Sequence, residues 1–273
     1  MNPLPAELRV DTALPQHNVA GLRLDYLTPD DIAQSVIARA GLVPGFCCVQ
    51  CAHQCIEVYK DPKLAAAVSA ATLRVSDSKI LDLARQFLHG VDPLPTLKGA
   101  DLMIHLARAA ASAGKRIGFF GGTEETVAKL VERLLHDVPG CEVGYACAPP
   151  FGSLSDLAAG EYAKEINRSN IQILFVGLGC PKQEWWMYRN RQLVEPFMVG
   201  VGAAFDFVAG TKRPSPPWVH RNGLEWLYRF LQEPRRLWRR YVIDAPFFLW
   251  LVVEQRLNRG RQRRPCPGGH PAE

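Results

Sequence analysis

Asp77 is the side chain in this sequence best placed to act as a general base. It follows an apolar segment and stands between Ser76 and Ser78. A carboxylate at the end of a strand can take the proton from an acceptor hydroxyl as that hydroxyl attacks an electrophilic carbon. The same position would equally suit the N-cap of a helix that begins near Lys79, and local sequence does not separate the two roles.

A second set of polar side chains follows a glycine turn in the segment GLGCPKQEWW, residues 177–186. Gly179 precedes Lys182, Gln183 and Glu184, which we expect in the first turn of a helix. Lys182 could pair with a phosphate, and Gln183 could donate to and accept from a sugar or a base. Alternatively, Glu184 complements the helix dipole in solvent and Lys182 is merely exposed. A lysine in a first turn opposes the dipole, which favours a function.

Two further places could bind a ligand. Gly121 and Gly122 put backbone amides at a predicted helix start, where the dipole and unpaired N–H groups favour phosphate. The motif there, GFFGGTEE, is not the GxGxxG fingerprint of dinucleotide sites. Asp206 stands between two aromatic residues, and an acid in apolar surroundings must find a partner. It could bind sugar hydroxyls or cap a neighbouring helix.

Four cysteines, Cys47, Cys48, Cys51 and Cys55, surround His53. Their spacing lacks the second pair of ligands that a closed zinc site requires. A buried strand that enters a helix explains them as small apolar residues. We therefore predict no metal and no cofactor.

Short apolar runs alternate with helical segments, which is typical of an α/β fold built on a parallel sheet. We predict a Rossmann-like parallel sheet flanked by helices, with a helical basic C-terminal appendage. Residue 206 falls in the last predicted strand region, and Ser155 is the predicted N-cap of a helix over 156–168. The predicted strand regions are 19–27 (a strand or hairpin), 46–50, 73–77, 116–122, 141–146, 171–179 and 195–207. The predicted division is a flexible N-terminus (1–18), the α/β core (19–222), an amphipathic appendage (223–260) and a disordered basic tail (261–273).

The C-terminal region carries most of the excess positive charge. The chain has a net charge of +5, and nine arginines lie between positions 235 and 264. Arginines interleaved with Trp238, Tyr241, Phe247 and Trp250 are typical of an element that lies on anionic lipid. Alternatively, the apolar face packs on the protein's own core or forms a homo-oligomer interface. This interleaving does not favour a nucleic-acid groove.

The N-terminus has no apolar signal-peptide core, and no run of about eighteen apolar residues is present. We therefore expect a cytoplasmic protein that associates peripherally with the inner face of the cell membrane.

Five segments in this order resemble the WecG/TagA/CpsF family of bacterial glycosyltransferases, and the resemblance covers residues 19–241. They are LKGADLM (97–103), IGFFGGTEE (117–125), ILFVGLGCPKQEWW (173–186), VGVGAAFDFVAG (199–210) and GLEWLYRFLQEPRRLWRRY (223–241).

This resemblance implies an inverting, metal-independent transfer of a sugar from a UDP-sugar to a polyprenyl-diphosphate-linked saccharide, in exopolysaccharide or cell-surface polysaccharide synthesis. The family's aspartate base falls on Asp77. Without a metal, cationic side chains must stabilise the leaving diphosphate. The residues implied for the donor are Gly121, Gly122, Gly179, Lys182, Gln183, Glu184 and Asp206. Those implied for the acceptor or the diphosphate are Asp101, Arg229, Arg235, Arg236, Arg239 and Arg240.

The sequence departs from the family pattern near the expected base. Val49 and Cys51 replace a threonine and an asparagine, and Ser78 replaces the glycine after the base. Thr96 replaces an arginine, and the turn at 214–216 reads PSP. These departures leave the donor sugar open, and a catalytically inactive homologue that serves as a scaffold of polysaccharide assembly is the alternative.

Overall fold

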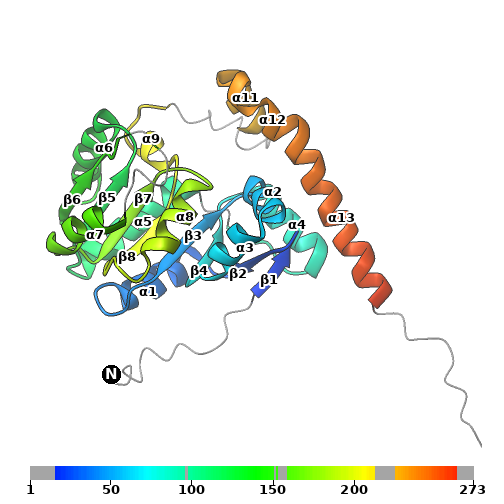
Figure 1. Cartoon of the computed structure of the whole chain (residues 1–273), viewed down its shortest axis with the longest axis horizontal. Coiled ribbons are helices and arrows are strands. Elements are labelled where there is room, and N and C mark those ends of the chain that lie inside the picture. The colour runs from blue at the N-terminus through cyan, green and yellow to red at the C-terminus, as the bar shows by residue number, and fades with distance from the viewer. Residues whose placement is uncertain (1–15, 96–97, 151, 153–158, 213–224, 263–273) are drawn as a thin grey trace, which may run out of the picture.

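The computed structural model describes residues 16–95, 98–150, 152, 159–212 and 225–262. Its centre is a six-stranded sheet in the order β4-β3-β8-β7-β5-β6, with every pair parallel (Figure 1). The strands are β3 (Phe46–Gln50), β4 (Leu73–Ser76), β5 (Ile117–Gly121), β6 (Val143–Cys147), β7 (Ile173–Gly177) and β8 (Phe197–Gly200). The predicted Rossmann-like sheet is confirmed.

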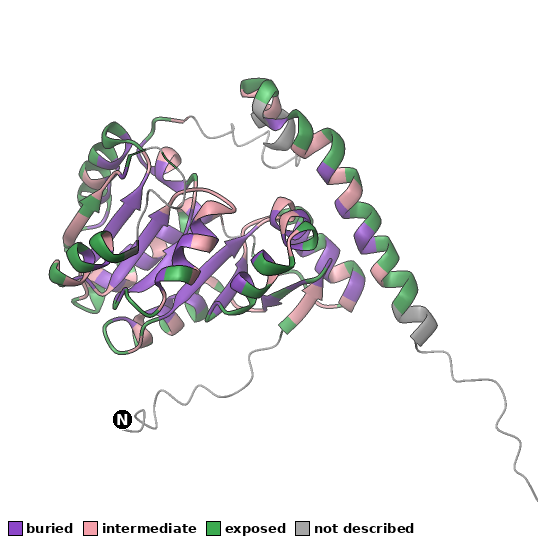
Figure 2. Cartoon of the chain, viewed as in Figure 1, coloured by how far each residue is buried: buried purple, intermediate pink, exposed green. Residues whose placement is uncertain are grey.

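Helices cover both faces of the sheet, which explains why its strands are continuous apolar runs rather than alternating ones. The helices α1 (Pro29–Arg39), α5 (Gly99–Ser112), α6 (Glu124–Asp137) and α9 (Ala204–Val208) enclose the core on one face. The helices α7 (Ala159–Arg168) and α8 (Lys182–Asn190) close the other. Five of the six strands are almost wholly buried, and the edge strand β6 is only partly covered (Figure 2).

Helix α1 begins where the sequence predicts, because Thr28 is its N-cap. The Thr28 hydroxyl accepts a hydrogen bond from the backbone N–H of Asp31 at 3.2 Å, and the Asp31 carboxylate accepts from the Thr28 N–H at 3.0 Å. This capping box satisfies two amide groups at the helix start that would otherwise lack partners.

A second, smaller core joins the two ends of the chain. It lies between the antiparallel hairpin of β1 (Gln16–Val19) and β2 (Leu22–Asp25), the helices α2 (Ala52–Lys60), α3 (Pro62–Ser69) and α4 (Lys79–His89), and the C-terminal α13 (Ala245–Gln262). Phe248, Leu251 and Val252 of α13 are buried in it. The side chain of Gln255 accepts from the Ala20 N–H at 2.8 Å and donates to the Asn18 carbonyl at 2.9 Å. One face of the appendage therefore packs on the protein's own core.

The remainder of the appendage consists of α11 (Glu225–Gln232), α12 (Pro234–Arg239) and a π-helical turn, η2 (Arg240–Asp244), that leads into α13. Of the described helices, none is long and apolar enough to span a membrane.

Several boundaries differ from the sequence prediction. β1 begins at Gln16, inside the region predicted to be flexible, and the last predicted strand region, 195–207, contains both β8 and most of helix α9. β8 ends at Gly200 because Gly202, with φ at +55°, begins the turn into α9. Helix α13 extends to Gln262, and the rest of the tail lies outside the described residues, as do Ser155, Thr96 and the turn at 214–216.

Candidate active site

The sheet reverses its winding direction between β5 and β7, which is where open α/β sheets bind ligands. The chain leaves β5 through α6 towards β6 and leaves β7 through α8 towards β8, on opposite faces. Gly121 pairs with Gly177, and a Cβ at Gly121 would lie 2.5 Å from the Gly177 carbonyl carbon. Gly121, Gly122 and Gly179 all have positive φ values. The two predicted glycine turns therefore lie together at this edge, where only glycine fits at residue 121.

Asp77 lies directly after β4. It is therefore on the same side of the sheet as the glycine turns, where the parallel strands have their carboxyl-terminal ends. Its backbone N–H donates to the Gln50 carbonyl at 2.9 Å, and its side chain is half-buried. The N-cap of α4 is Ser78, so the alternative role of Asp77 as that cap is wrong. A Cβ at Gly99 would lie 3.9 Å from Oδ2 of Asp77, so the start of α5 lies beside this carboxyl group. A helix N-terminus favours the ionised form of a carboxylate placed against it.

Arg240, from the C-terminal appendage, lies close enough to Asp77 for the two charges to interact. Its Nη2 atom donates to Sγ of Cys51 at 3.2 Å, and Cys51 directly precedes α2. Burial alone would lower the pKa of Arg240, but the charges of Cys51, Tyr241 and Asp77 outweigh it and raise the pKa. Burial also raises the pKa of the Cys51 thiol, which stays neutral near neutral pH. Asp77 is the one carboxyl group among these neighbours of Arg240.

A buried carboxylate, Asp244, connects the turn that carries Arg240 to α2. Asp244, four residues on and 4% exposed, accepts from Nζ of Lys60 at 3.1 Å and lies 3.2 Å from Nδ1 of His53. Burial and the charge of Arg240 lower the pKa of His53. Isolated π-helical turns occur frequently at functional sites, since they change the direction of side chains within a helix. Here the turn places Arg240 towards Cys51 while Asp244 binds α2.

The other predicted cationic and acidic residues are distributed differently. Arg235 and Arg239 are exposed on α12, and the side chains of Arg229 and Arg236 lie outside the described part of the chain. Asp101 is exposed in the first turn of α5. Of the five predicted arginines, Arg240 is therefore the one that the described structure brings to Asp77.

Gln183 and Glu184 form a buried polar wall with Gln54. Nε2 of Gln54 donates to Oε1 of Glu184 at 2.6 Å, and Nε2 of Gln183 donates to the same oxygen at 3.0 Å. Oε1 of Gln54 accepts from the Cys51 N–H at 2.6 Å, which links the wall to the Arg240 contact. Glu184 is only 1% exposed, so the alternative of a solvated helix start is wrong for it.

Part of this wall has no hydrogen-bond partner within the described residues. The atoms without one are Oε2 of Glu184 and Oε1 of Gln183. Both side-chain amide atoms of Gln50, at the end of β3, also lack one. A Cβ at Gly202 would lie 3.4 Å from Oε1 of Gln183, so this oxygen reaches the end of β8. Buried polar atoms are almost always satisfied by protein, water or ligand. The wall is therefore suited to hold an ordered water or a polar substituent of a ligand.

Replacing Glu184 by glutamine should make stability less sensitive to pH. Burial raises the pKa of Glu184, so the folded protein favours its protonated form. The resulting stabilisation is present below the unfolded-state pKa and is lost as pH rises through the folded-state pKa. Unfolding midpoints of wild type and Glu184→Gln should match at about pH 4, and the variant should be more stable at about pH 8. An exposed control, Glu132→Gln, should follow wild type. An equal loss of stability on alkalinisation in wild type and Glu184→Gln would contradict this account.

Lys182 and Asp206 already have protein partners. Nζ of Lys182 donates to the Gly152 carbonyl at 2.7 Å. The Asp206 carboxylate lies 3.1 Å from Nζ of Lys212, which also contacts Glu233 of the appendage at 3.5 Å. Asp206 is partly exposed, so the expectation of apolar surroundings is wrong for it, because α9 turns this residue outwards.

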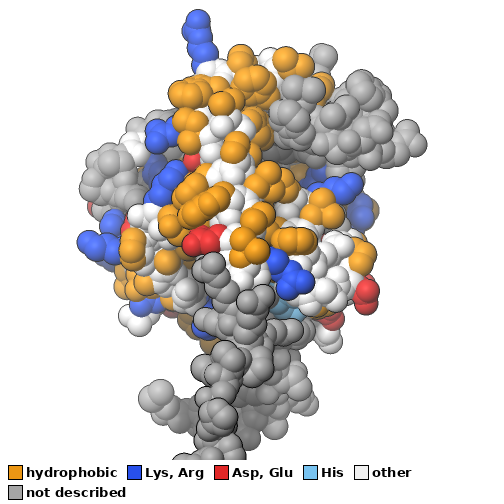
Figure 3. Space-filling model, turned by 90° about the vertical axis from the view of Figure 1, so that its right-hand side faces the viewer, with side chains coloured by type: hydrophobic (Ala, Val, Ile, Leu, Met, Phe, Trp, Pro, Cys, Tyr) orange, Lys and Arg blue, Asp and Glu red, His pale blue; other side chains and the backbone are white. Residues whose placement is uncertain are grey.

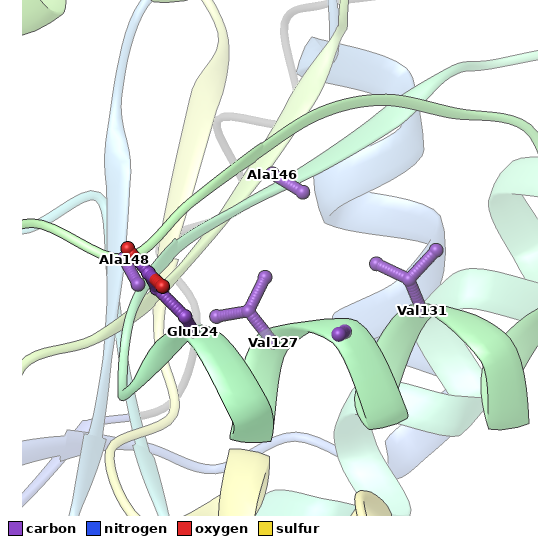
Figure 4. Close-up of a pocket in the computed structure, with 6 residues that line it drawn as sticks. Glu124, Val127, Val131, Ala146 and Ala148 are labelled. Atoms are coloured by element: carbon purple, nitrogen blue, oxygen red, sulfur yellow. The ribbon is translucent and has the colours of Figure 1, made fainter.

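A shallow pocket of about 370 Å³ lies at the other end of the sheet (Figure 4). Side chains of α6 face the end of β6 across it. β6 and β4 are opposite edges of the sheet, so this pocket is separate from Asp77. Its lining residues are Glu124, Val127, Ala128, Val131, Ala146 and Ala148.

The cysteine cluster is part of the fold, as the predicted strand that enters a helix requires. Cys47 and Cys48 lie on β3 and Cys55 on α2, and all three are fully buried. Burial raises the pKa of each thiol. Within the described ranges, no group of three or more His, Cys, Asp or Glu side chains is arranged to hold a metal ion.

Comparison with known proteins gives consistent matches. Residues 17–262 match the family described as "Glycosyl transferase WecG/TagA/CpsF family". An N-acetylglucosaminyldiphosphoundecaprenol N-acetyl-beta-D-mannosaminyltransferase of Bacillus spizizenii is 30% identical over 200 residues, which cover 72% of this chain and 74% of the relative. A protein of the same name from Bacillus subtilis is 29% identical over 165 residues, which cover 60% and 61% of the two chains.

Proposed function

The chain belongs to the WecG/TagA/CpsF family of glycosyltransferases, and we propose that it transfers a sugar from a UDP-sugar to a saccharide linked to a polyprenyl diphosphate. The two relatives carry the name of an enzyme that acts on N-acetylglucosaminyldiphosphoundecaprenol, which supports a lipid-linked diphosphate acceptor. The chemistry is a single displacement with inversion, in which side chains and not a metal stabilise the leaving group.

The observation that carries this proposal is the nearness of Asp77, at the carboxyl-terminal ends of the strands, to Arg240, whose charge it influences. Asp77 accepts the proton of the acceptor hydroxyl, whose oxygen forms the new bond to the anomeric carbon. The bond from that carbon to the diphosphate breaks, and its electron pair passes to the diphosphate oxygen of UDP. The Arg240 guanidinium stabilises this developing charge in a partly dehydrated site.

The donor lies, in this proposal, along the edge that runs from the glycine turns towards Asp77. Backbone amides near Gly122 and Gly179 favour the phosphates, since Thr123 is the N-cap of α6 and Pro181 that of α8. Gln183, with its unsatisfied oxygen, lies beside the end of β8 and is placed to read a polar substituent of the sugar. Cys51 replaces the family's asparagine and is occupied by Arg240, so we do not assign the donor sugar.

We further propose that the appendage rests on the inner face of the cell membrane. Hydrophobic side chains form a band over its exposed side, with Lys and Arg side chains at the margins (Figure 3). Such a surface fits an element that lies in the interface of anionic lipid. It would bring the site to the depth of a lipid-linked diphosphate. The exposed apolar residues are Leu231, Trp238, Val242, Ile243, Leu249, Trp250, Val253 and Leu257.

The proposed activity is tested by incubating the full chain with a panel of UDP-sugars and N-acetylglucosamine linked to a polyprenyl diphosphate in anionic vesicles. We expect release of UDP and an equal amount of lipid-linked disaccharide with at least one donor, both measured by mass spectrometry. Hydrolysis of the donor in the absence of acceptor measures the background. No product from any donor would refute the proposal and favour a binding or scaffold role in polysaccharide assembly.

A further inference from the structure

Helix α4 exposes an apolar stripe that the proposed reaction has not used. Ile80, Leu83 and Phe87 are 40%, 52% and 55% exposed. Their spacing of three and four residues places them on one face of the helix. The opposite face already supplies Leu81 and Leu88 to the second core. The helix is thus apolar on two sides, and on the exposed side the described structure gives Phe87 a contact with the guanidinium of Arg256.

The stripe begins at the candidate active site. Ile80 follows Asp77 by three residues, and Ser78 between them is the N-cap of α4. With a rise of about 1.5 Å per residue, the stripe from Ile80 to Phe87 is about 10 Å long. A molecule that is bound at Asp77 and extends out of the site along α4 therefore contacts an apolar surface.

At its far end the stripe continues into the surface that we propose faces lipid. Helix α4 packs against α13, and the guanidinium of Arg256 lies 5.8 Å from the centre of the Phe87 ring. Leu249, Val253 and Leu257 of α13 are each about half exposed or more. A connected apolar surface of this kind marks an interaction site more often than scattered exposed side chains do.

The charges along the stripe suit an anionic amphiphile. The one acid of α4, Asp82, is buried, so the exposed face of this helix carries no carboxylate. Lys79 is exposed at the end near Asp77, and Arg256 is exposed at the other end. A partner with an anionic head at the site and an uncharged tail along the helix meets no repulsion here.

We propose that Ile80, Leu83 and Phe87 bind the first isoprene units of the acceptor's polyprenyl chain. This inference rests on the proposed function, since it assumes that the acceptor presents its sugar hydroxyl to Asp77. An acceptor in that position must direct its chain out of the site. The stripe provides an apolar path from the reacting sugar to the membrane surface.

The test compares two soluble acceptors in solution without vesicles. One is N-acetylglucosamine linked by diphosphate to a farnesyl group, and the other carries a methyl group in its place. Calorimetry measures the Kd of both for wild type, for Leu83→Ser/Phe87→Ser, and for a matched double control, Leu42→Ser/Leu135→Ser, whose residues are exposed elsewhere. Circular dichroism checks that each chain is folded.

We expect wild type and the control to bind the farnesyl acceptor more tightly than the methyl acceptor. The stripe variant should lose about tenfold of this preference, since two apolar contacts are removed. An unchanged preference would overturn the inference. If ultracentrifugation then showed that the variant had dissociated a wild-type dimer, the stripe would be an interface between copies. If it had lost vesicle binding instead, the stripe would be a bilayer contact. Binding is measured apart from turnover, so a failure of sugar transfer would refute the proposed function alone.

Discussion

Replacing Asp77 by asparagine should lower kcat by roughly 10³-fold, because the acceptor hydroxyl then loses its proton acceptor. The amide keeps the size of the carboxylate, and the backbone bond from Asp77 to Gln50 does not involve the side chain. Circular dichroism should therefore show a retained fold, while the unfolding temperature should fall because Arg240 loses a neighbouring negative charge. The variant should bind the donor as wild type does, and its residual rate should lose the rise with pH that ionisation of a base produces.

The matched control is Asp30, whose side chain is 90% exposed beside His105. Asp30→Asn should retain wild-type kcat. Transfer is measured under saturating donor and acceptor, so that kcat is read separately from KM. A kcat for Asp77→Asn within about threefold of wild type would remove Asp77 as the base.

Replacing Arg240 by alanine should lower kcat by about 10²- to 10³-fold, the size of effect found when a donor to a developing oxyanion is removed. Loss of this guanidinium leaves the neutral Cys51 thiol without its partner, which costs little stability. Lysine at this position should restore only part of the rate, because an ammonium cannot reproduce the fork of a guanidinium.

The control for charge is Arg108→Ala, an exposed arginine on α5. It lowers the net charge by the same amount and should leave kcat unchanged. A donor with a different leaving group tests whether Arg240 stabilises the departing diphosphate. A donor with a better leaving group should be less affected by Arg240→Ala than the UDP-sugar. Equal losses for both donors would mean that Arg240 holds the fold and does not stabilise the leaving diphosphate.

The elements that depend on local sequence could be predicted closely. The continuous apolar run at 171–179 forms the central strand β7, and Thr28, Pro29 and Asp31 cap α1 as their spacing requires. The common edge of the polar residues could also be predicted, since parallel strands all end on the same side. Asp77 and the glycine turns do lie at these strand ends.

Features that depend on tertiary packing could not be predicted from the sequence. Five arginines share one local pattern, and only the docking of α13 and the register of the π-helical turn select Arg240. Glu184 looks like an ordinary first-turn acid, yet α8 turns it inwards against Gln54. Gln54 itself was not predicted as a site residue. The available signal was its place three residues after Cys51, where a capping glutamine is expected.

The most direct test of the account is the anomeric configuration of the new bond in the transfer product. A single displacement driven by Asp77, with the diphosphate leaving towards Arg240, must invert the configuration of the donor carbon. From an α-linked UDP-sugar, the coupling constants in the proton NMR spectrum of the product should show a β-linkage. An α-linked product would show retention and contradict the assignment of Asp77 as a base that acts on the acceptor in one step.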